Sequence, residues 1–337
     1  MDGNFGGARR RLTESVAQAA DRLPDPLRRG PLALCLSGGT DSSALALACS
    51  DLHSLRPDLF PAGIRAVHAR HGLRGSESEG DADSVRELCG SLNLALRMVD
   101  APVDPGPSLE ARAREARYRA LREAEPTALL ATAHHGGDQA ETVVLRLLRG
   151  AGPRGLVSIR PLRDDGIWRP LLEVSRDDLA EACRQSGWTA REDSSNADLG
   201  FSRNRLRHEI LPAWERDEPG TARALVALAR SAQELEPFLE RALDRLSDLL
   251  LLRVDADGFQ LDFSSWPNDR EHPQADPELD PLLERTWTRL GRRPWASEHR
   301  TRLVADACAG RSGRRSGGQG ETAVFGGGRL RVERTPD

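Results

Sequence analysis

Residues 32–47 read Leu-Ala-Leu-Cys-Leu-Ser-Gly-Gly-Thr-Asp-Ser-Ser-Ala-Leu-Ala-Leu, and this stretch decides the fold of the chain. Residues 32–36 form an apolar run with the length of a buried strand. Residues 37–40 have little side-chain bulk and include two glycines, which tolerate the positive φ of a tight turn. Asp41 and Ser42 open a segment of good helix formers. A strand, a glycine turn and a helix start present free N–H groups at the positive end of a helix dipole, which favours binding of an anion such as phosphate.

Two interpretations of this stretch are open. It is either a tight βα turn that binds no ligand or a phosphate loop whose hydroxyls and carboxylate orient a phosphate or a metal ion. All 48 Lys+Arg residues of the chain are arginine. A Walker-type P-loop needs a lysine after its glycines, so that class is excluded. The loop instead resembles the pyrophosphate-binding loop of the N-type ATP pyrophosphatases, and its predicted cofactor-binding residues are Ser37, Gly38, Gly39, Thr40, Asp41 and Ser42.

The composition bounds the architecture and the location. A length of 337 residues favours about two domains. The first eleven residues are polar and no apolar run approaches the length of a membrane span, so we expect a cytoplasmic protein with no membrane partner. The five cysteines form no Cys-x-x-Cys pair, which argues against a zinc site or a disulfide scaffold. The net charge is −4, but segments 146–176 and 311–337 carry an excess of arginine that either faces solvent or contacts nucleic acid.

Strand and helix patterns alternate over the first two thirds of the chain. Strands are predicted at 32–36, 64–68, 94–99, 128–132 and 167–172, and helices at 9–23, 41–52, 79–92, 108–125, 138–149 and 175–186. This alternation predicts an α/β fold with a doubly wound, mostly parallel sheet. Ligands of such sheets bind beyond the carboxyl ends of the strands. We therefore expect the polar residues that follow the strands to converge on one edge.

The pattern changes after Pro212. Helices are predicted at 219–252, 279–290 and 297–309, and a short terminal strand at 329–333. Residues 312–328 are rich in glycine and serine, which is typical of a flexible segment. The predicted domains are therefore a catalytic domain at 1–214, a smaller helical domain at 215–311 that binds the substrate, and a Gly/Arg-rich tail at 312–337.

Polar motifs follow two further strands. His68-Ala-Arg-His71-Gly-Leu-Arg74 comes after the second strand, and the residues either face solvent or point at the ligand edge. Ala133-His134-His135-Gly136-Gly137-Asp138-Gln139-Ala140-Glu141-Thr142 comes after the fourth strand. An Asp138-x-x-Glu141 pattern is also typical of a capped helix start that binds no ligand. Capping does not explain the two successive histidines, however. A carboxylate at a ligand edge holds either Mg²⁺ or a cationic amine.

Two arginine motifs point to phosphate. In the helix predicted at 108–125, Arg114, Arg117 and Tyr118 share one face, and the guanidinium fork suits a phosphate. The alternative is a solvent-exposed helix with Arg/Glu pairs. In segment 193–212, a cluster predicted to bind the backbone of a nucleic acid consists of Arg203, Asn204, Arg205 and Arg207.

Taken in order, these motifs resemble those of the tRNA(Ile)-lysidine synthase family. The likeness runs from the phosphate loop through the His68 motif, residues 113–118 and 133–142, Pro170-Leu-Leu and residues 193–212. Members of this family often have Asp-Asp-Gln where this chain has Gly137-Asp138-Gln139, which leaves Asp138 as the acid of that motif. Longer members carry a further C-terminal domain, so the tRNA contacts of this chain are expected to differ.

The resemblance implies a reaction in two steps on the wobble cytidine of tRNA(Ile) with a CAU anticodon. ATP adenylates the oxygen at ring position 2 and releases pyrophosphate. The ε-amine of free L-lysine then displaces AMP to give lysidine. The implied cofactors are ATP and Mg²⁺, the implied fold is the Rossmann-like ATP pyrophosphatase fold, and the resemblance allows a homodimer.

The resemblance also implies roles for individual residues. Asp41 holds Mg²⁺, and Arg114 neutralises charge on the α-phosphate. Asp138 binds the ammonium of lysine, and His134 positions or deprotonates a reacting group. His68 joins the phosphate loop in binding the nucleotide.

Three alternatives are weighed against this interpretation. A tRNA thiolase of the same superfamily would need paired cysteines, and the sequence has no suitable pair. A glutamine-dependent amidotransferase would need a glutaminase domain, and none is seen. A tRNA-binding module without enzymatic activity requires a dead phosphate loop, whereas residues 37–42 look intact.

Overall fold

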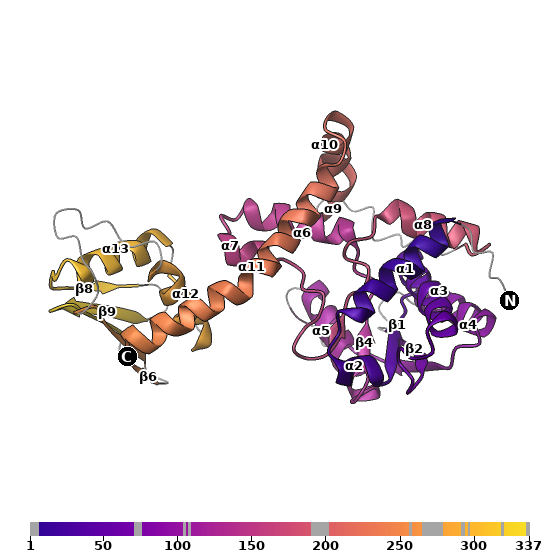
Figure 1. Ribbon diagram of the computed structural model, residues 1–337, viewed down its shortest axis with the longest axis horizontal. Helices are drawn as coiled ribbons and strands as arrows, with labels where there is room; N and C mark the ends of the chain where they lie inside the picture. The colour runs from indigo at the N-terminus through magenta and orange to yellow at the C-terminus, as the bar shows by residue number, and fades with distance from the viewer. Residues whose placement is uncertain are drawn as a thin grey trace. The chain divides into compact units, whose positions relative to one another are not determined.

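A computed structural model describes residues 7–70, 76–103, 106, 109–189, 202–255, 258–264, 279–290, 294–295, 297–317 and 320–334 of the chain. The chain forms two compact units, Met1–Glu234 and Leu235–Asp337. The boundary falls within helix α11 (Thr221–Leu250) (Figure 1). This division differs from the predicted boundary at residue 215. The first half of α11 belongs to the first unit. Within it, Gln233 Nε2 donates to the carbonyls of Val157 and Ile159 at 2.8 and 2.9 Å.

The first unit contains a five-stranded parallel sheet, which confirms the predicted fold class of this part. Its strand order is β3-β2-β1-β4-β5, and all four neighbouring pairs are parallel. The strands are β1 (Leu32–Cys35), β2 (Ile64–Arg70), β3 (Leu96–Asp100), β4 (Leu129–Ala131) and β5 (Ile167–Trp168). In the middle of the sheet, Leu32 lies beside Ile64 of β2 and beside Leu129 of β4.

Helices cover both faces of this sheet because successive strand residues point to opposite sides. Leu32 and Leu34 pack in the large core that includes α1, α3 and α8. Ala33 packs on the other side, against Leu121 of α5. The helices of the unit are α1 (Gly7–Asp21), α2 (Asp25–Arg29), α3 (Thr40–Leu55), α4 (Ser76–Ser91), α5 (Leu109–Ala124), α6 (Gly136–Leu147), α7 (Pro153–Leu156), α8 (Arg176–Gln185), α9 (Ser202–Arg205), a π-helical turn (Leu206–Ile210) and α10 (Leu211–Asp217).

The strand order makes β1 and β4 the switch point of the sheet. The chain builds β1, β2 and β3 outward in one direction and then returns to place β4 on the other side of β1. The strand order reverses at this point, and ligands of open parallel sheets bind beyond the carboxyl ends of the strands there. The segments that follow β1 and β4 are the phosphate loop and the His134 motif, so the topology brings together the two motifs that the sequence singles out.

The second unit corrects the prediction of a purely helical domain followed by a flexible tail. It holds helices α12 (Leu279–Arg289) and α13 (Ser297–Cys308) and an antiparallel sheet of order β6-β7-β10-β9-β8. The strands are β6 (Leu251–Asp255), β7 (Gly258–Asp262), β8 (Gly313–Ser316), β9 (Glu321–Gly326) and β10 (Arg329–Arg334). The glycines of the predicted tail make its turns, because Gly327 and Gly328 have φ of 59° and 76° between β9 and β10. Leu330 and Val332 of β10 are buried.

No helix in the described part of the chain is both long enough and apolar enough to cross a membrane. None of the five cysteines, which all lie in the described residues, forms a disulfide bond. Burial raises the pKa of Cys49 and of Cys183 to about 12, so both are protonated thiols that pack like small apolar side chains.

Candidate active site

The turn after β1 requires glycine at its first bend. Gly38 has a φ of 92°, and a Cβ there would lie 3.1 Å from the carbonyl oxygen of Asp81. Gly39 is extended and precedes α3 without any side-chain cap. The first N–H groups of α3, from Thr40 onward, therefore meet no capping side chain, which leaves them open to an anion.

Ser42 holds the shape of the loop. Its side chain is 4% exposed. Its Oγ accepts from the backbone N–H and the hydroxyl of Ser37, both at 3.1 Å, and donates to the carbonyl of Gly39 at 2.9 Å. Ser42 thus has a structural role in the loop, and its contact with the cofactor stays a prediction. Ser37 is exposed at the mouth of the loop.

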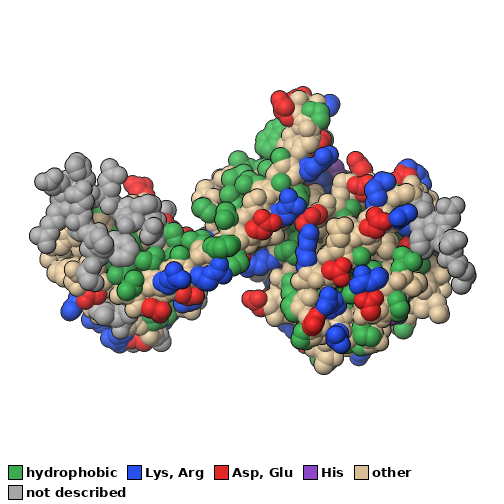
Figure 2. Space-filling view, in the orientation of Figure 1, with side chains coloured by type: hydrophobic (Ala, Val, Ile, Leu, Met, Phe, Trp, Pro, Cys, Tyr) green, Lys and Arg blue, Asp and Glu red, His purple; other side chains and the backbone are tan. Residues whose placement is uncertain are grey.

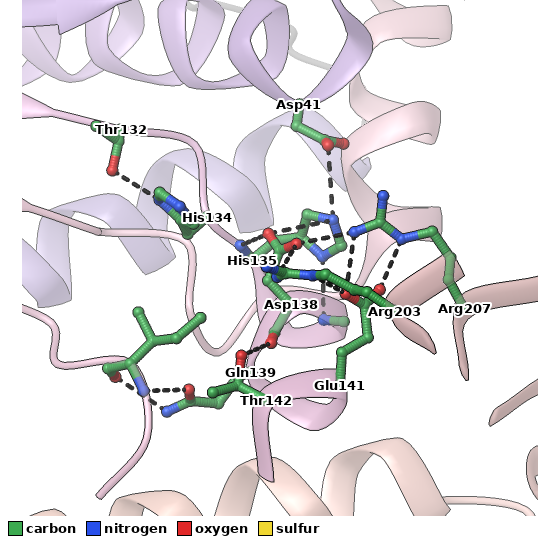
Figure 3. Close-up of polar contacts among 12 residues, drawn as sticks. Asp41, Thr132, His134, His135, Asp138, Gln139, Glu141, Thr142, Arg203 and Arg207 are labelled. Atoms are coloured by element: carbon green, nitrogen blue, oxygen red, sulfur yellow. Dashed lines mark hydrogen bonds and ion pairs between the residues drawn. The ribbon is translucent and has the colours of Figure 1, made fainter. Parts of the chain in front are cut away.

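Asp41 carries an unsatisfied carboxylate oxygen. Its Oδ1 is buried and has no hydrogen-bond partner in the described part of the chain. Its Oδ2 lies 3.5 Å from Nε2 of His135 (Figure 3). Burial raises the pKa of Asp41, while His135 acts against that shift. A buried acceptor without a donor is costly to fold, and a cation or a donor of the substrate would satisfy it.

His135 and Asp138 cap the start of α6. The backbone N–H of Gly137 donates to His135 Nδ1 at 3.0 Å, and the backbone N–H of His135 donates to Asp138 Oδ2 at 3.1 Å. In the neutral imidazole the proton therefore sits on Nε2, which faces Asp41. The absence of a side chain at Gly137 also has a local explanation, since a Cβ there would come within 2.7 Å of the His135 ring. The departure from the family pattern at residue 137 thus leaves room for this ring.

His134 is a neutral side chain. Its Nδ1 lies 2.9 Å from the hydroxyl of Thr132. Burial lowers the pKa of His134 to about 3; nearby arginines, Arg114 among them, act in the same direction, while Asp138 opposes them. A base of this strength is far from the best pKa for proton transfer near neutral pH, so the geometry favours positioning over deprotonation.

Two carboxylates of α6 meet two arginines of the α9 region. Arg203 donates to Glu141 at 2.7 Å and to Asp138 at 3.1 Å. Arg207 donates to Glu141 at 2.6 and 3.1 Å and to Asp138 at 2.9 Å (Figure 3). Burial alone would raise the pKa of Asp138, but His135, His134 and Arg203 hold it below its ordinary value. Asp138 is therefore an ionised, fixed acceptor.

In this ion cluster Arg203 and Arg207 pair with carboxylates of α6, and the Arg207 side chain is only 20% exposed. Their contact with an RNA backbone stays a prediction. Arg205 points elsewhere, with a side chain that is 61% exposed and 3.8 Å from Glu209. Sequence reasoning missed His135 and Glu141 as site residues. The signal for Glu141 was its spacing from Asp138, which places both carboxylates on one helical face.

Arg114 and His68 differ in exposure. Arg114 is exposed, lies 5.2 Å from the centre of the Tyr118 ring, and pairs with no carboxylate among the described residues. His68 is buried, and its Nδ1 donates to the carbonyl of Leu36 at 2.8 Å, so it supports the turn from below. Burial lowers the pKa of His68. The rest of its motif, residues 71–74, lies outside the described residues, as does segment 193–201.

Among the described residues, no group of three or more His, Cys, Asp or Glu side chains is arranged to hold a metal ion. Mg²⁺ commonly binds through one or two carboxylates together with substrate phosphates and water. The unsatisfied Asp41 Oδ1 beside an anion-binding turn fits that mode.

Comparison with known proteins agrees with this geometry. A family model described as a PP-loop domain matches residues 12–214. The tRNA(Ile)-lysidine synthase of Solibacter usitatus is 37% identical over 220 residues, which are 64% of this chain and 48% of that protein. The enzyme of the same name from Chromobacterium violaceum is 41% identical over 189 residues, 54% of this chain and 42% of that protein. The one from Pseudomonas aeruginosa is 38% identical over 244 residues, 70% of this chain and 52% of that protein.

The chain thus spans about half the length of the curated relatives it matches. Among solved structures, the U34-tRNA thiolase NcsA from Methanococcus maripaludis with its 4Fe-4S cluster superposes with a TM-score of 0.53 and 17% identity. The match covers 67% of this chain and 79% of that one. At this identity the likeness supports the fold alone.

Proposed function

This chain belongs to the PP-loop domain family, and we propose that it joins lysine to the wobble cytidine of tRNA(Ile) at the expense of ATP. The reaction would proceed through an adenylated cytidine and give lysidine, AMP and pyrophosphate. The names of the relatives support this proposal. The observation that carries it is the 3.5 Å approach of Asp41 and His135, which puts the phosphate loop and the lysine-binding candidates into one site. Transfer of labelled lysine to tRNA(Ile) that requires ATP tests it.

The first step needs a held nucleotide and an activated oxygen. The open N–H groups at the start of α3 would hold the phosphates of ATP. Mg²⁺, when bound at Asp41, would supply charge stabilisation for the departing pyrophosphate. The carbonyl oxygen at ring position 2 is a poor leaving group, so its conversion to an AMP ester prepares it for displacement as AMP by the amine. Arg114 would meet charge that develops on the α-phosphate, and this role is supported by its exposed guanidinium, which pairs with no carboxylate among the described residues.

The second step needs a lysine held by its charges. Asp138 Oδ1 already accepts from Arg203 and Arg207, so an ammonium would approach Oδ2, which accepts one hydrogen bond from the His135 backbone N–H. Glu141 keeps both guanidiniums in place. His134, neutral and hydrogen-bonded to Thr132, would orient a reacting group. We therefore propose that this cluster binds lysine. The exposed Arg205, with Asn204 beside it in sequence, is proposed to contact the tRNA with the CAU anticodon.

Arg114→Ala is expected to slow adenylation of tRNA about 10²-fold or more, the scale of losing one preorganised charged donor. Arg117→Ala, a change of the same kind three residues along α5, should have a smaller effect. Single-turnover transfer of labelled AMP to tRNA measures both. Equal losses in the two variants would show that Arg114 has no special position toward the phosphate.

A further inference from the structure

An arginine cluster at the carboxyl end of β5 takes no part in the chemistry proposed above. It consists of Arg146 at the end of α6, Arg160 and Arg163 in the segment before β5, and Arg169 directly after β5. The sequence already shows an imbalance here, with seven arginines against three acids in segment 146–176. On the face of the first unit shown in Figure 2, by contrast, positive and negative side chains are interspersed.

Arg169 is the buried member of this arginine cluster, with only 5% of the residue exposed. Its Nη1 donates to the carbonyl of Arg160 at 2.7 Å. Its Nε is buried and has no partner among the described residues. Buried arginines are almost always paired with a carboxylate, yet Arg169 pairs with none in the described part of the chain.

The neighbours of Arg169 add positive charge. The guanidiniums of Arg114 and Arg163 lie 5.2 and 5.5 Å from the centre of the Tyr118 ring. Burial lowers the pKa of Arg169, and Arg163 and Arg114 lower it further, while Tyr118 opposes. Burial likewise lowers the pKa of Arg146, with repulsion from Arg160 added. Asp165, which pairs with Arg163 at 2.7 Å, neutralises only one of these positive charges. The folded chain thus carries positive charge that an outside anion would relieve.

The position of β5 indicates which anion this is. The strand order runs β1, β4, β5, and neighbouring strands lie about 4.8 Å apart. The phosphate loop follows β1, His134 follows β4 and Arg169 follows β5. The phosphate loop would therefore hold the pyrophosphate part of ATP on one side of His134, and the arginine cluster would lie on the other side, beyond Arg114, with its strand about two strand spacings from β1. A second phosphate on that side fits the backbone of the polynucleotide whose base reacts between them.

We infer that the arginine cluster around Arg169 binds a phosphodiester of the RNA next to the reacting nucleotide. The inference rests on the proposed function for the identity of the RNA. Guanidinium forks suit phosphate oxygens, and backbone contacts of this kind fix the position of a nucleic acid on a protein. A phosphate of ATP has the same chemistry, and the experiment separates the two sources.

Arg169→Gln removes the charge and keeps an N–H donor near the position of Nε, although the shorter side chain gives up the hydrogen bond from Nη1 to the Arg160 carbonyl. Binding of tRNA(Ile), measured without ATP or lysine, should weaken about tenfold, and the slope of log affinity against log salt should fall by about 0.7–0.9, the value for one lost phosphate contact. The melting temperature should stay the same or rise, because an uncompensated buried charge is gone. Affinity for ATP should not change. Arg169→Lys, which retains the charge, should restore most of the salt dependence.

Arg163→Gln, at an exposed and acid-paired position, provides a second variant that does not disturb the interior. Its matched control is Arg10→Gln on α1, where the arginine is also exposed and paired with an acid, Glu14. Arg163→Gln should lower the salt slope and Arg10→Gln should not. A parental slope in both Arg169→Gln and Arg163→Gln would overturn the inference, as would weakened ATP binding with normal tRNA binding. Absence of tRNA binding by the parental chain would instead overturn the proposed function.

Discussion

Asp41→Ala is expected to abolish exchange of pyrophosphate into ATP in the presence of tRNA, a loss of at least about 10²–10³-fold, while the protein stays folded. The Asp41 side chain makes no capping hydrogen bond, and its Oδ1 has no partner among the described residues, so the fold gains little from it. Burial also raises its pKa, which means that folding works against its charge. Because this unpartnered carboxylate contributes little to stability and lies beside an anion-binding turn, we expect it to take part in the reaction.

Asp51→Asn is the matched control on the same helix. The Asp51 side chain is 6% exposed, against 35% for Asp41, and it is fully engaged, since Arg9 donates to both of its oxygens at 2.6 and 2.7 Å. Its replacement should lower the melting temperature and leave exchange intact, the opposite pattern to Asp41→Ala. Normal exchange in a folded Asp41→Ala protein would remove Asp41 from the site.

Asp138→Asn should spare adenylation and block transfer of lysine, so that adenylated tRNA accumulates. The asparagine oxygen can still accept from the backbone N–H of His135, so the start of α6 keeps its cap. The charge that would bind the ammonium is lost, and among the described residues Arg203 and Arg207 retain only Glu141 as an anionic partner. Acid-gel separation of adenylated tRNA from lysidine-bearing tRNA measures the outcome.

Asp178→Asn is the control for this change. Asp178 lies in the first turn of α8, where its backbone N–H donates to the cap residue Ser175, and its side chain is exposed. It should behave like the parental enzyme. Normal lysine transfer by Asp138→Asn would reduce Asp138 to a helix cap, whereas loss of adenylation as well would place it in the first step.

The first unit was predictable because its signals are local. Apolar runs of strand length, glycine turns and helix periodicity recur along the chain, and they give the parallel sheet and the ligand edge. The sheet of the second unit was not, because β8 and β9 lie in or beside a glycine-rich segment that composition alone marks as flexible. What makes it ordered is cross-strand pairing, such as Leu330 opposite Phe325 and Leu261, which depends on partners far apart in the sequence.

The candidate site shows the same division. The motifs identified Asp41, His134 and Asp138 as residues of one edge, and the structure brings these three residues together. The pairing of Arg203 and Arg207 with Asp138 and Glu141 joins positions 62 to 69 residues apart, and the sequence offers no local sign of it. The internal role of Ser42 is also a matter of three-dimensional packing, because a hydroxyl in a phosphate loop can face the ligand or the loop itself.

The central claim is that one site activates a cytidine with ATP and then attaches lysine to it. Mass spectrometry of nucleosides from tRNA(Ile), after incubation with the protein, ATP, Mg²⁺ and lysine, tests this most directly. We expect the cytidine of the CAU anticodon to be replaced by a nucleoside that carries one lysine, with no change when ATP or lysine is left out. Unmodified cytidine after incubation with folded protein that binds both ATP and tRNA would contradict the account.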